Sequence, residues 1–382
     1  MSLDALYRRV DALLETRARD HPRRLEPAWS DLLAAVDELA TRLREEGERG
    51  EPGPLPGFYD RPVFVVGHRK TGTTLLLDLL DGHSGLVVLP GESNHFLTFL
   101  PQFGGLPPEA LAVEAQRWWM LRLVSPSGIP PFWAAGPWPE PYRAFTRRLL
   151  ALVPAYPDRD SLGLAAVALG GDAPVAWVEK TPGQEHVVDE ILARYPEARF
   201  LHVLRDPRSV AAAVSRLDAQ TGEATDLVAL GLTIRRSFEA AAENAGRLGV
   251  NRYQVVRYED LVGGPEQTMR RVVDTLGLEW SPTLLTPTVG GVAATSNSAW
   301  SDRKVIGEIE GRRLDLWREQ LGDSAASLIA AATRSPARAY GYELPSPGLR
   351  ESANVAARRA RVAVAQLRSR GTPSPPAPAR RP

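Results

Sequence analysis

The chain has 382 residues, of which 43% are hydrophobic and 24% charged, as in an ordinary soluble globular protein with one large α/β domain or two small ones. Its 46 basic and 46 acidic residues balance to a formal net charge of +0, so no global charge favours nucleic acid or an anionic membrane as a partner. The chain has no cysteine, which excludes disulfides and thiolate metal sites.

Residues 1–48 are predicted to form a helical extension. The stretches "LYRRVDALLE" and "WSDLLAAVDELATRLREE" repeat apolar residues at helical spacing, and His21-Pro22 separates them. Charges occur throughout the first segment, unlike the apolar core of a signal peptide. No run reaches the roughly 18 apolar residues of a membrane-spanning helix. We therefore expect a cytoplasmic protein without an integral membrane segment.

The α/β domain is predicted to cover 61–345 and to follow a Gly/Pro connector at 47–60. "RPVFVVG" and "GLVVLPGE" read as strands, with the helix "TTLLLDLLDGH" between them. Residues 96–160, rich in proline and tryptophan, are predicted to be an insertion of irregular loops and short helices. This aromatic insertion has two interpretations, the lining of a substrate pocket or an aromatic mini-core.

From residue 175 onward strands alternate with helices. "APVAWVEK", "ARFLHVLRD" and "YQVVRYEDL" are predicted strands, each followed by a helical stretch. This order predicts an α/β fold with a parallel β-sheet flanked by helices on both faces. The arginine-rich tail at 347–382, which ends "GTPSPPAPARRP", is predicted to be a basic helix followed by disorder, with contact to an anionic surface as the alternative.

Lysine is scarce in this chain. Among the 46 lysines and arginines, lysine occurs only at Lys70, Lys180 and Lys304. Such arginine preference is typical of a GC-rich bacterial genome. A retained lysine can mark a place that needs a compact ammonium rather than a planar guanidinium, although any one of them can also be there by chance.

The stretch "VVGHRKTGTTLL" is predicted to be a strand, a glycine turn and a helix. Gly67 and Gly72 have the spacing of a Walker loop, but Thr73 stands where the Walker lysine would be, and Lys70 lies inside the loop. Backbone amides and the helix dipole predict binding of a phosphate-like anion. The missing Walker lysine argues against ordinary ATP hydrolysis, whereas a lysine inside the loop can neutralise charge on a departing phosphate.

"GHRKTGTTLL" resembles the 5′-phosphosulfate loop of sulfotransferases that use 3′-phosphoadenosine 5′-phosphosulfate (PAPS), in which lysine or arginine and one further residue precede Gly-Thr-Thr. The resemblance extends over roughly 61–320, through "VEKTPGQEHVVDEILARYPEARFLHVLRDPRSVAAAV", "VRYEDLVGGPEQTMRRVVDTLGL", and "SNSAW" followed by "GRRLDLWREQL". It implies a P-loop NTPase-like sulfotransferase fold and metal-independent, in-line transfer of a sulfuryl group from PAPS to an acceptor hydroxyl, with 3′,5′-ADP as the second product.

The resemblance also implies a cofactor site. Lys70 would stabilise the departing 5′-phosphate, Arg205 would bind the 3′-phosphate, and Tyr258 would lie near the adenine. The family has a serine eight residues after this arginine, where this chain has Ala213; Ser209, one turn earlier on the same helix face, is the expected substitute. The expected cofactor-binding set is Arg69, Lys70, Thr71, Gly72, Thr73, Thr74, Arg205, Ser209, Tyr258, Ser298, Arg312 and Arg313.

An acceptor hydroxyl must lose its proton as it attacks, which requires a general base. Family members use glutamate or histidine, and "LPGESNHF" offers Glu92 and His95, with the spacing from Lys70 favouring Glu92. Lys180 resembles a family lysine near the transferring group, and an ion pair with Glu179 or Glu185 is its alternative. The expected catalytic set is Lys70, Glu92, His95 and Lys180.

Two other functions remain open at this point. A P-loop kinase or NTPase would bind Mg-ATP, and Thr73 argues against it. A catalytically inactive nucleotide-binding protein is the second, and Ala213 supports it. The expected partner is a hydroxyl-bearing small molecule, sugar or lipid, and the oligomeric state is left open.

Overall fold

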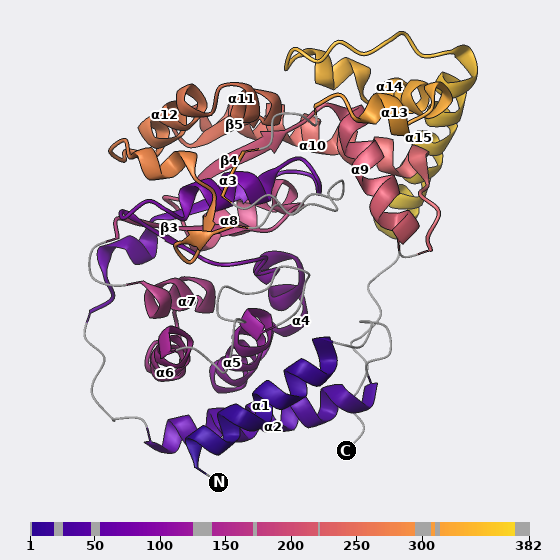
Figure 1. Cartoon of the computed structure of the whole chain (residues 1–382). Helices are drawn as coiled ribbons and strands as arrows, with labels where there is room; N and C mark the ends of the chain where they lie inside the picture. The colour runs from indigo at the N-terminus through magenta and orange to yellow at the C-terminus, as the bar shows by residue number, and fades with distance from the viewer. Residues whose placement is uncertain are drawn as a thin grey trace. The chain divides into compact units, whose positions relative to one another are not determined.

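The computed structural model describes residues 2–18, 26–46, 54–124, 140–170, 174–220, 222–294, 307–309 and 314–370 (Figure 1). The chain divides into two compact units. The first contains Met1–Leu204 and Ala240–Gly311, and the second contains Arg205–Glu239 and Arg312–Pro382. The loop with Lys70 belongs to the first unit, and Arg205 begins the second.

The first unit is built on a five-stranded parallel sheet. Its strands are β1 (Pro62–Val66), β2 (Leu86–Val88), β3 (Ala176–Lys180), β4 (Arg199–Leu204) and β5 (Tyr253–Arg257), in the order β2-β3-β1-β4-β5. Every residue of β1 is buried, as expected for a parallel strand covered on both faces. The predicted α/β fold with a parallel sheet is therefore confirmed.

Side chains of the sheet alternate between two apolar cores. Val63 and Val65 of β1 pack in a core with α3 (Thr73–Leu80) and α12 (Pro265–Leu276). Phe64 and Val66 pack in a second core that includes Trp177 and residues of the helical insertion. The other short elements of this unit are η1 (Gly57–Asp60), η3 (Gln184–His186), α8 (Val188–Arg194), α11 (Tyr258–Gly263), η4 (Pro282–Leu285), β6 (Thr288–Val289) and β7 (Val292–Ala293).

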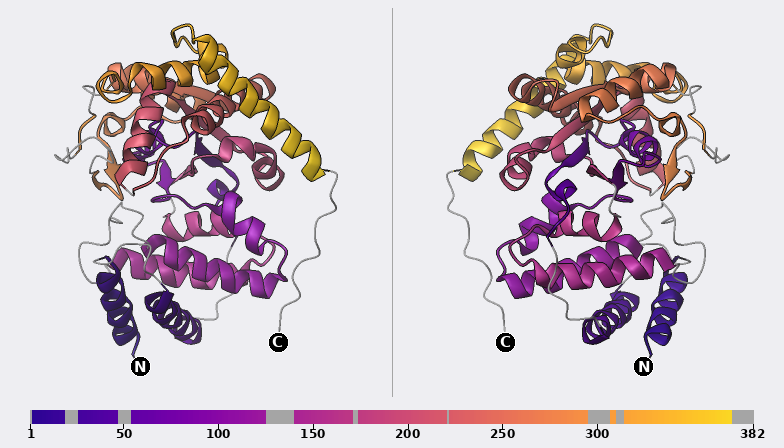
Figure 2. Two further views of the ribbon diagram at one scale, coloured as in Figure 1. Left: turned by 90° about the vertical axis from the view of Figure 1, so that its right-hand side faces the viewer. Right: turned by 90° about the vertical axis from the view of Figure 1, so that its left-hand side faces the viewer.

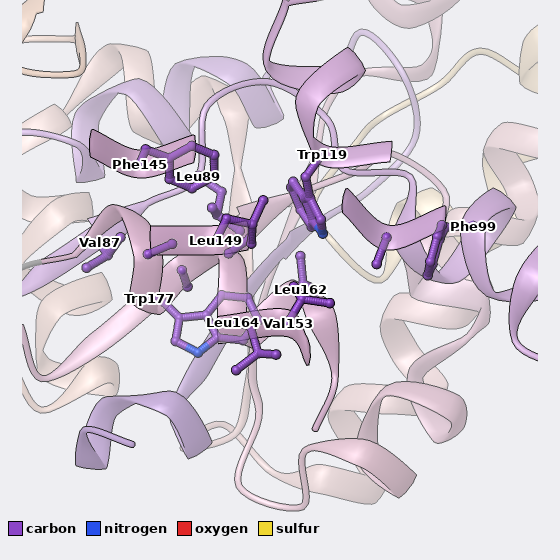
Figure 3. Close-up of a cluster of buried hydrophobic side chains, with 14 of the residues drawn as sticks. Val87, Leu89, Phe99, Trp119, Phe145, Leu149, Val153, Leu162, Leu164 and Trp177 are labelled. Atoms are coloured by element: carbon purple, nitrogen blue, oxygen red, sulfur yellow. The ribbon is translucent and has the colours of Figure 1, made fainter. Parts of the chain in front are cut away.

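The insertion between β2 and β3 is helical. It comprises η2 (His95–Phe99), α4 (Leu100–Phe103), α5 (Pro108–Val124), α6 (Glu140–Ala155) and α7 (Ser161–Leu169). Figure 3 shows part of the core they share with the sheet, including Trp119, Leu149 and Trp177. At 17 and 16 residues, α5 and α6 are longer than the short helices predicted, because both bury apolar residues four apart, such as Ala115 with Trp119 and Leu149 with Val153. The proline-rich stretch 125–139 lies outside the described residues.

The two predicted N-terminal helices are α1 (Leu3–Ala18) and α2 (Glu26–Glu46). They pack on each other through buried residues such as Tyr7 and Leu39, and they lie beside α5 and α6 (Figure 2). Arg117 of α5 donates to Asp37 of α2, with Nε and Oδ1 2.6 Å apart. The N-terminal extension is thus joined to the insertion rather than to the sheet.

The second unit is helical in its described part. It contains α9 (Pro207–Gln220), the first half of α10 (Leu227–Leu248), α13 (Trp317–Gln320), α14 (Asp323–Arg338) and α15 (Leu349–Arg370). Gly231 lets α10 approach α14 closely, since a Cβ there would lie 2.8 Å from that of Ala332. The basic helix predicted after residue 347 corresponds to α15, and 371–382 lie outside the described residues.

Within the described ranges of both units, no helix combines the length and the apolar character needed to cross a membrane.

Candidate functional site

The loop from Gly67 to Gly72 joins the end of β1 to the start of α3. Thr71 closes this turn, because its backbone N–H and its Oγ1 both donate to the His68 carbonyl, at 3.2 and 2.8 Å. The helix α3 begins at Thr73 without a side-chain cap, and the backbone N–H groups in the first turn of a helix have no acceptor within the helix. A phosphate group binds favourably at such a helix start. Of the predicted loop residues, Arg69 is exposed, Thr71 and Thr73 are buried, and Lys70, Gly72 and Thr74 are half-buried.

Both loop glycines are required by their surroundings. A Cβ on Gly67 would lie 2.5 Å from the carbonyl oxygen of Val203, and a Cβ on Gly72 would lie 2.3 Å from Cδ2 of Tyr258. The ring of Tyr258, the residue predicted to lie near the adenine, therefore packs directly on the loop backbone. A side chain at either glycine would have to displace β4 or Tyr258.

Two non-glycine residues among those described have positive φ angles. These are Lys70 at 70° and Asn94 at 51°. A left-handed backbone is disfavoured for residues with a Cβ and persists only where the surrounding structure holds it. Lys70 is a predicted catalytic residue, and Asn94 lies two residues after Glu92. Both strained positions therefore fall in the predicted catalytic segments.

The predicted catalytic residues Glu92 and Lys180 form one ion pair. Nζ of Lys180 lies 2.8 Å from Oε1 of Glu92, and the lysine side chain is 1% exposed whereas the glutamate is 43% exposed. Lys180 is the last residue of β3 and is in register with Val65 of β1, so the pair lies at the same end of the sheet as the Gly67–Gly72 loop. In open α/β sheets, ligands bind at the carboxyl ends of the strands where the strand order reverses, as it does around β1.

The segment after β3 is fastened to the loop. The Gly67 N–H donates to Oε2 of Glu185 at 3.1 Å, and the Gly183 N–H donates to the Gly67 carbonyl at 3.1 Å. Between these two contacts lies Gln184, whose side chain is fully buried and whose two amide atoms have no hydrogen-bond partner among the described residues. A buried amide without a partner is a candidate contact for a bound molecule.

Burial determines the charge of two titratable groups near this end of the sheet. Burial lowers the pKa of His202 to about 4, although the charge of Glu185 raises it, so this imidazole is neutral at neutral pH. Burial raises the pKa of Asp78 on α3 to about 8 despite the lowering effect of Lys180, so this carboxyl is largely protonated at neutral pH. The carboxylate that pairs with Lys180, at 2.8 Å, is that of Glu92 and not that of Asp78.

His95 lies in a different setting from Glu92. It is 1% exposed, its Nε2 lies 2.9 Å from Oδ1 of Asp160, and its ring stacks on Phe99 with centroids 5.1 Å apart. Asp160 also accepts from Tyr195 at 3.1 Å. Burial raises the pKa of Asp160, but the charge and hydrogen bond of His95, the hydrogen bond from the Leu162 N–H and the charge of Arg194 together bring it below its ordinary value. His95 is thus part of a buried hydrogen-bond network.

In the second unit, the predicted phosphate ligands lie at the start of α9. Arg205 directly follows β4 and is 8% exposed. The Asp206 carboxylate accepts from the Arg208 backbone N–H at 2.8 Å and from the Arg208 guanidinium at 2.7 Å. Ser209 Oγ donates to the Leu314 carbonyl at 3.2 Å, which occupies its only proton. A phosphate would have to compete for that proton, so the role of Ser209 stays a prediction.

A sulfotransferase family model, described as "Sulfotransferase family", matches residues 62–282, which is more than half of the chain. The chain belongs to the sulfotransferase family. The matched range includes the loop, the Glu92–Lys180 pair, Arg205 and Tyr258. The resemblance of these segments to sulfotransferases is therefore confirmed at the level of the family.

Several characterised proteins are similar to this sulfotransferase family member. The omega-hydroxy-beta-dihydromenaquinone-9 sulfotransferase Stf3 of Mycobacterium bovis is 27% identical over 252 residues, covering 57% of this chain and 63% of that protein. The nodulation protein NoeE of Sinorhizobium fredii is 24% identical, covering 70% and 61%. The protein-tyrosine sulfotransferase of Drosophila melanogaster is 24% identical, covering 68% and 48%. This chain thus spans less than two thirds of the length of each.

Solved sulfotransferase domains are also similar in structure. The domain from the olefin synthase of Synechococcus PCC 7002 has a TM-score of 0.46 and 21% identity, covering 78% of this chain and 99% of that domain. The domain from the curacin biosynthetic pathway has a TM-score of 0.49 and 19% identity, covering 77% and 100%.

Some predicted residues lie beyond what the structure describes, and others were missed by sequence reasoning. Ser298, Arg312, Arg313 and Lys304 fall outside the described residues. The missed residues are those that hold the loop of Glu92, namely Ser93, Glu179 and Thr181. The alternation of side chains along the strand "AWVEK" places Glu179 and Lys180 on opposite faces of the sheet. This alternation could have identified Glu179 as a residue separate from the Lys180 site. No group of three or more potential metal ligands occurs in the described part of the chain.

Proposed function

We propose that this sulfotransferase family member transfers a sulfuryl group from PAPS to a hydroxyl group of its acceptor by in-line displacement, leaving 3′,5′-ADP. The observation that carries the proposal is the Lys180–Glu92 ion pair, with its 2.8 Å contact, at the same end of the sheet as the Lys70 loop. Such a site combines an anion-binding loop, a cation for the leaving phosphate and a carboxylate able to accept a proton.

The residues present are suited to the proposed donor. When bound, PAPS would supply the sulfuryl group, and its 5′-phosphate would be held by the amides and side chains of Lys70, Gly72, Thr73 and Thr74. Tyr258, which packs on Gly72, would contact the adenine. We propose Arg205 and Ser209 for the 3′-phosphate. The remaining proposed cofactor-binding residues are Arg69 and Thr71 of the loop, and Ser298, Arg312 and Arg313. The ammonium of Lys70 would neutralise the leaving phosphate, so we propose no metal in the reaction.

Glu92 is the proposed general base. Its carboxylate is 43% exposed and so reachable by an acceptor, whereas His95 is 1% exposed and its Nε2 is occupied by Asp160. The proton of the acceptor hydroxyl would pass to a carboxylate oxygen of Glu92 as the oxygen attacks sulfur. Lys180 would hold the carboxylate in place through the ion pair and would be freed as Glu92 becomes neutral.

The proposed acceptor carries a hydroxyl group. This agrees with the names of two relatives, an omega-hydroxy-dihydromenaquinone sulfotransferase and a protein-tyrosine sulfotransferase, although these differ widely in acceptor size and polarity. The helical insertion, which follows the loop of Glu92 directly in the chain, is the proposed source of acceptor contacts.

A thermal-shift comparison of three nucleotides tests the proposed cofactor class. We expect 3′,5′-ADP to raise the unfolding temperature more than ADP or ATP with magnesium, because only the first carries the 3′-phosphate that Arg205 would bind. A ligand present at 100 times its Kd stabilises a protein by about 2.7 kcal/mol, which is readily measured. A larger shift with Mg-ATP would instead support the kinase or NTPase alternative.

A further inference from the structure

We propose that Glu179 is a positioning residue that holds the loop of Glu92 at the end of β3 through Ser93 and Thr181. The inference rests on the proposed role of Glu92 as the general base. Glu179 would act through these two residues, without contacting the acceptor itself.

Three donors converge on one oxygen of Glu179. Oε1 accepts from the Ser93 backbone N–H at 3.1 Å, from Ser93 Oγ at 2.5 Å and from Thr181 Oγ1 at 2.6 Å. The side chain is 0% exposed and in register with Phe64 of β1, on the face of the sheet that packs against the insertion. A buried carboxylate is costly unless it is hydrogen-bonded, so this arrangement ties the Ser93 segment to the strand.

The contacts continue from Ser93 and Thr181 into the strained part of the loop. Thr181 Oγ1, while donating to Glu179, accepts from the Asn94 N–H at 3.0 Å. Ser93 Oγ accepts from the His95 N–H at 3.2 Å, and the Ser93 carbonyl accepts from Nε1 of Trp118 at 3.0 Å. These bonds hold Asn94 at its positive φ and so set the direction in which the chain leaves Glu92.

Glu92 is thereby held from both faces of β3. Glu179 and Lys180 are consecutive, so their side chains point to opposite faces of the strand. Lys180 binds the carboxylate of Glu92, and Glu179 binds the backbone and side chain of the next residue, Ser93. Misplacement of a reacting group by about 1 Å can reduce the rate by about 100-fold, so fixing this loop contributes directly to transfer.

Burial raises the pKa of Glu179 above its ordinary value, and the hydrogen bonds from Ser93 and Thr181 and the charge of Lys180 offset part of this rise. Loss of the Thr181 hydroxyl would remove a restraint on Asn94 and would also favour neutral Glu179. Thr181→Val, which keeps the shape of the side chain, is therefore the sharpest single test.

The experiment compares Thr181→Val and Glu179→Gln with the wild type in the full chain. Hydrogen exchange measures how well the Ser93 and Asn94 amides are protected. Measurements of kcat, KM and 3′,5′-ADP affinity show the effect on transfer and on nucleotide binding. We expect faster exchange in the segment 92–95, a fall in kcat of about 10- to 100-fold, and 3′,5′-ADP affinity within about 2-fold of wild type. Thr181→Ser, which keeps the hydroxyl, should restore exchange protection and most of kcat.

Thr333→Val is the matched control, because Thr333 is also a fully buried threonine but donates to the Ile329 carbonyl within α14. It should change neither the exchange of 92–95 nor kcat. Unchanged exchange in Thr181→Val and Glu179→Gln, or faster exchange with unchanged kcat, would overturn the inference. So would parallel losses of kcat, 3′,5′-ADP affinity and unfolding temperature, which indicate general damage. A wild type without PAPS turnover refutes the proposed function instead, and exchange still decides whether Glu179 holds the loop.

Discussion

Replacing Lys70 with alanine is expected to lower kcat for sulfuryl transfer by about 100- to 1,000-fold, while 3′,5′-ADP affinity falls much less. Lys70 lies inside the anion-binding loop at a φ of 70°, a conformation that alanine tolerates no better than lysine. The substitution therefore removes the ammonium without changing the backbone requirement. Because charge on the leaving phosphate develops during bond breaking, the loss should appear mainly in kcat. Steady-state kinetics with PAPS and nucleotide titration measure the two effects separately.

Two further variants show whether the loss in Lys70→Ala comes from the missing ammonium or from a change in net charge. Lys70→Arg keeps a cation that the related loops also use, so it should retain more activity than Lys70→Ala. Arg61→Ala removes one exposed positive charge at the opposite end of β1 and should leave kcat near the wild-type value. Equal losses in Lys70→Ala and Arg61→Ala would show that only net charge matters. A wild type that binds 3′,5′-ADP but shows no turnover would instead favour the inactive nucleotide-binding alternative that Ala213 raises.

Glu92→Gln is expected to lower kcat by about 100- to 10,000-fold with 3′,5′-ADP binding retained. The amide oxygen can still accept a hydrogen bond from Lys180, but the amide cannot take the proton of the acceptor hydroxyl. Rapid-quench measurement of a single turnover with PAPS separates this chemical step from product release. The variant keeps the volume of the side chain but removes the negative charge beside Lys180, whose side chain is 1% exposed, so we also expect a lower unfolding temperature.

His95→Ala is the companion variant and should behave differently. It leaves the buried carboxylate of Asp160 without the 2.9 Å contact to His95, and such a loss costs about 1–3 kcal/mol of stability. We expect a lower unfolding temperature and a smaller kcat effect than in Glu92→Gln. A folded His95→Ala protein without activity, beside an active Glu92→Gln protein, would reverse the assignment of the base.

Local sequence patterns predicted the sheet well. The two neighbouring central strands β1 and β4 contain the apolar runs "PVFVV" and "FLHVL", the second interrupted only by His202, as burial on both faces requires. The anion-binding loop could also be predicted from the sequence, since the glycine spacing and the position of Lys70 are local features. Glu92 and Lys180 were both proposed as catalytic from the sequence, but their ion pair joins residues 88 positions apart and needs the strand order β2-β3-β1 to form.

Contacts between residues far apart in the sequence could not be predicted from local sequence patterns. The sequence alone allows His95 as well as Glu92 to be the base. The contact of His95 with Asp160, 65 residues later, is what distinguishes them, and it depends on the fold. The role of Glu179 depends on Ser93, 86 residues earlier. The lengths of α5 and α6 were underestimated because the segment 96–160 is rich in proline, although five of its eleven prolines lie between the two helices. In each case tertiary packing, rather than local preference, selects among conformations that the sequence allows.

Incubation of the full chain with PAPS and a library of hydroxyl-bearing acceptors tests the central claim most directly. The assay follows 3′,5′-ADP release and the gain of one sulfuryl group by an acceptor. We predict acceptor-dependent release of 3′,5′-ADP in equal amount to sulfated product, and its loss in Lys70→Ala. Absence of release with every acceptor, together with no binding of 3′,5′-ADP, would contradict it.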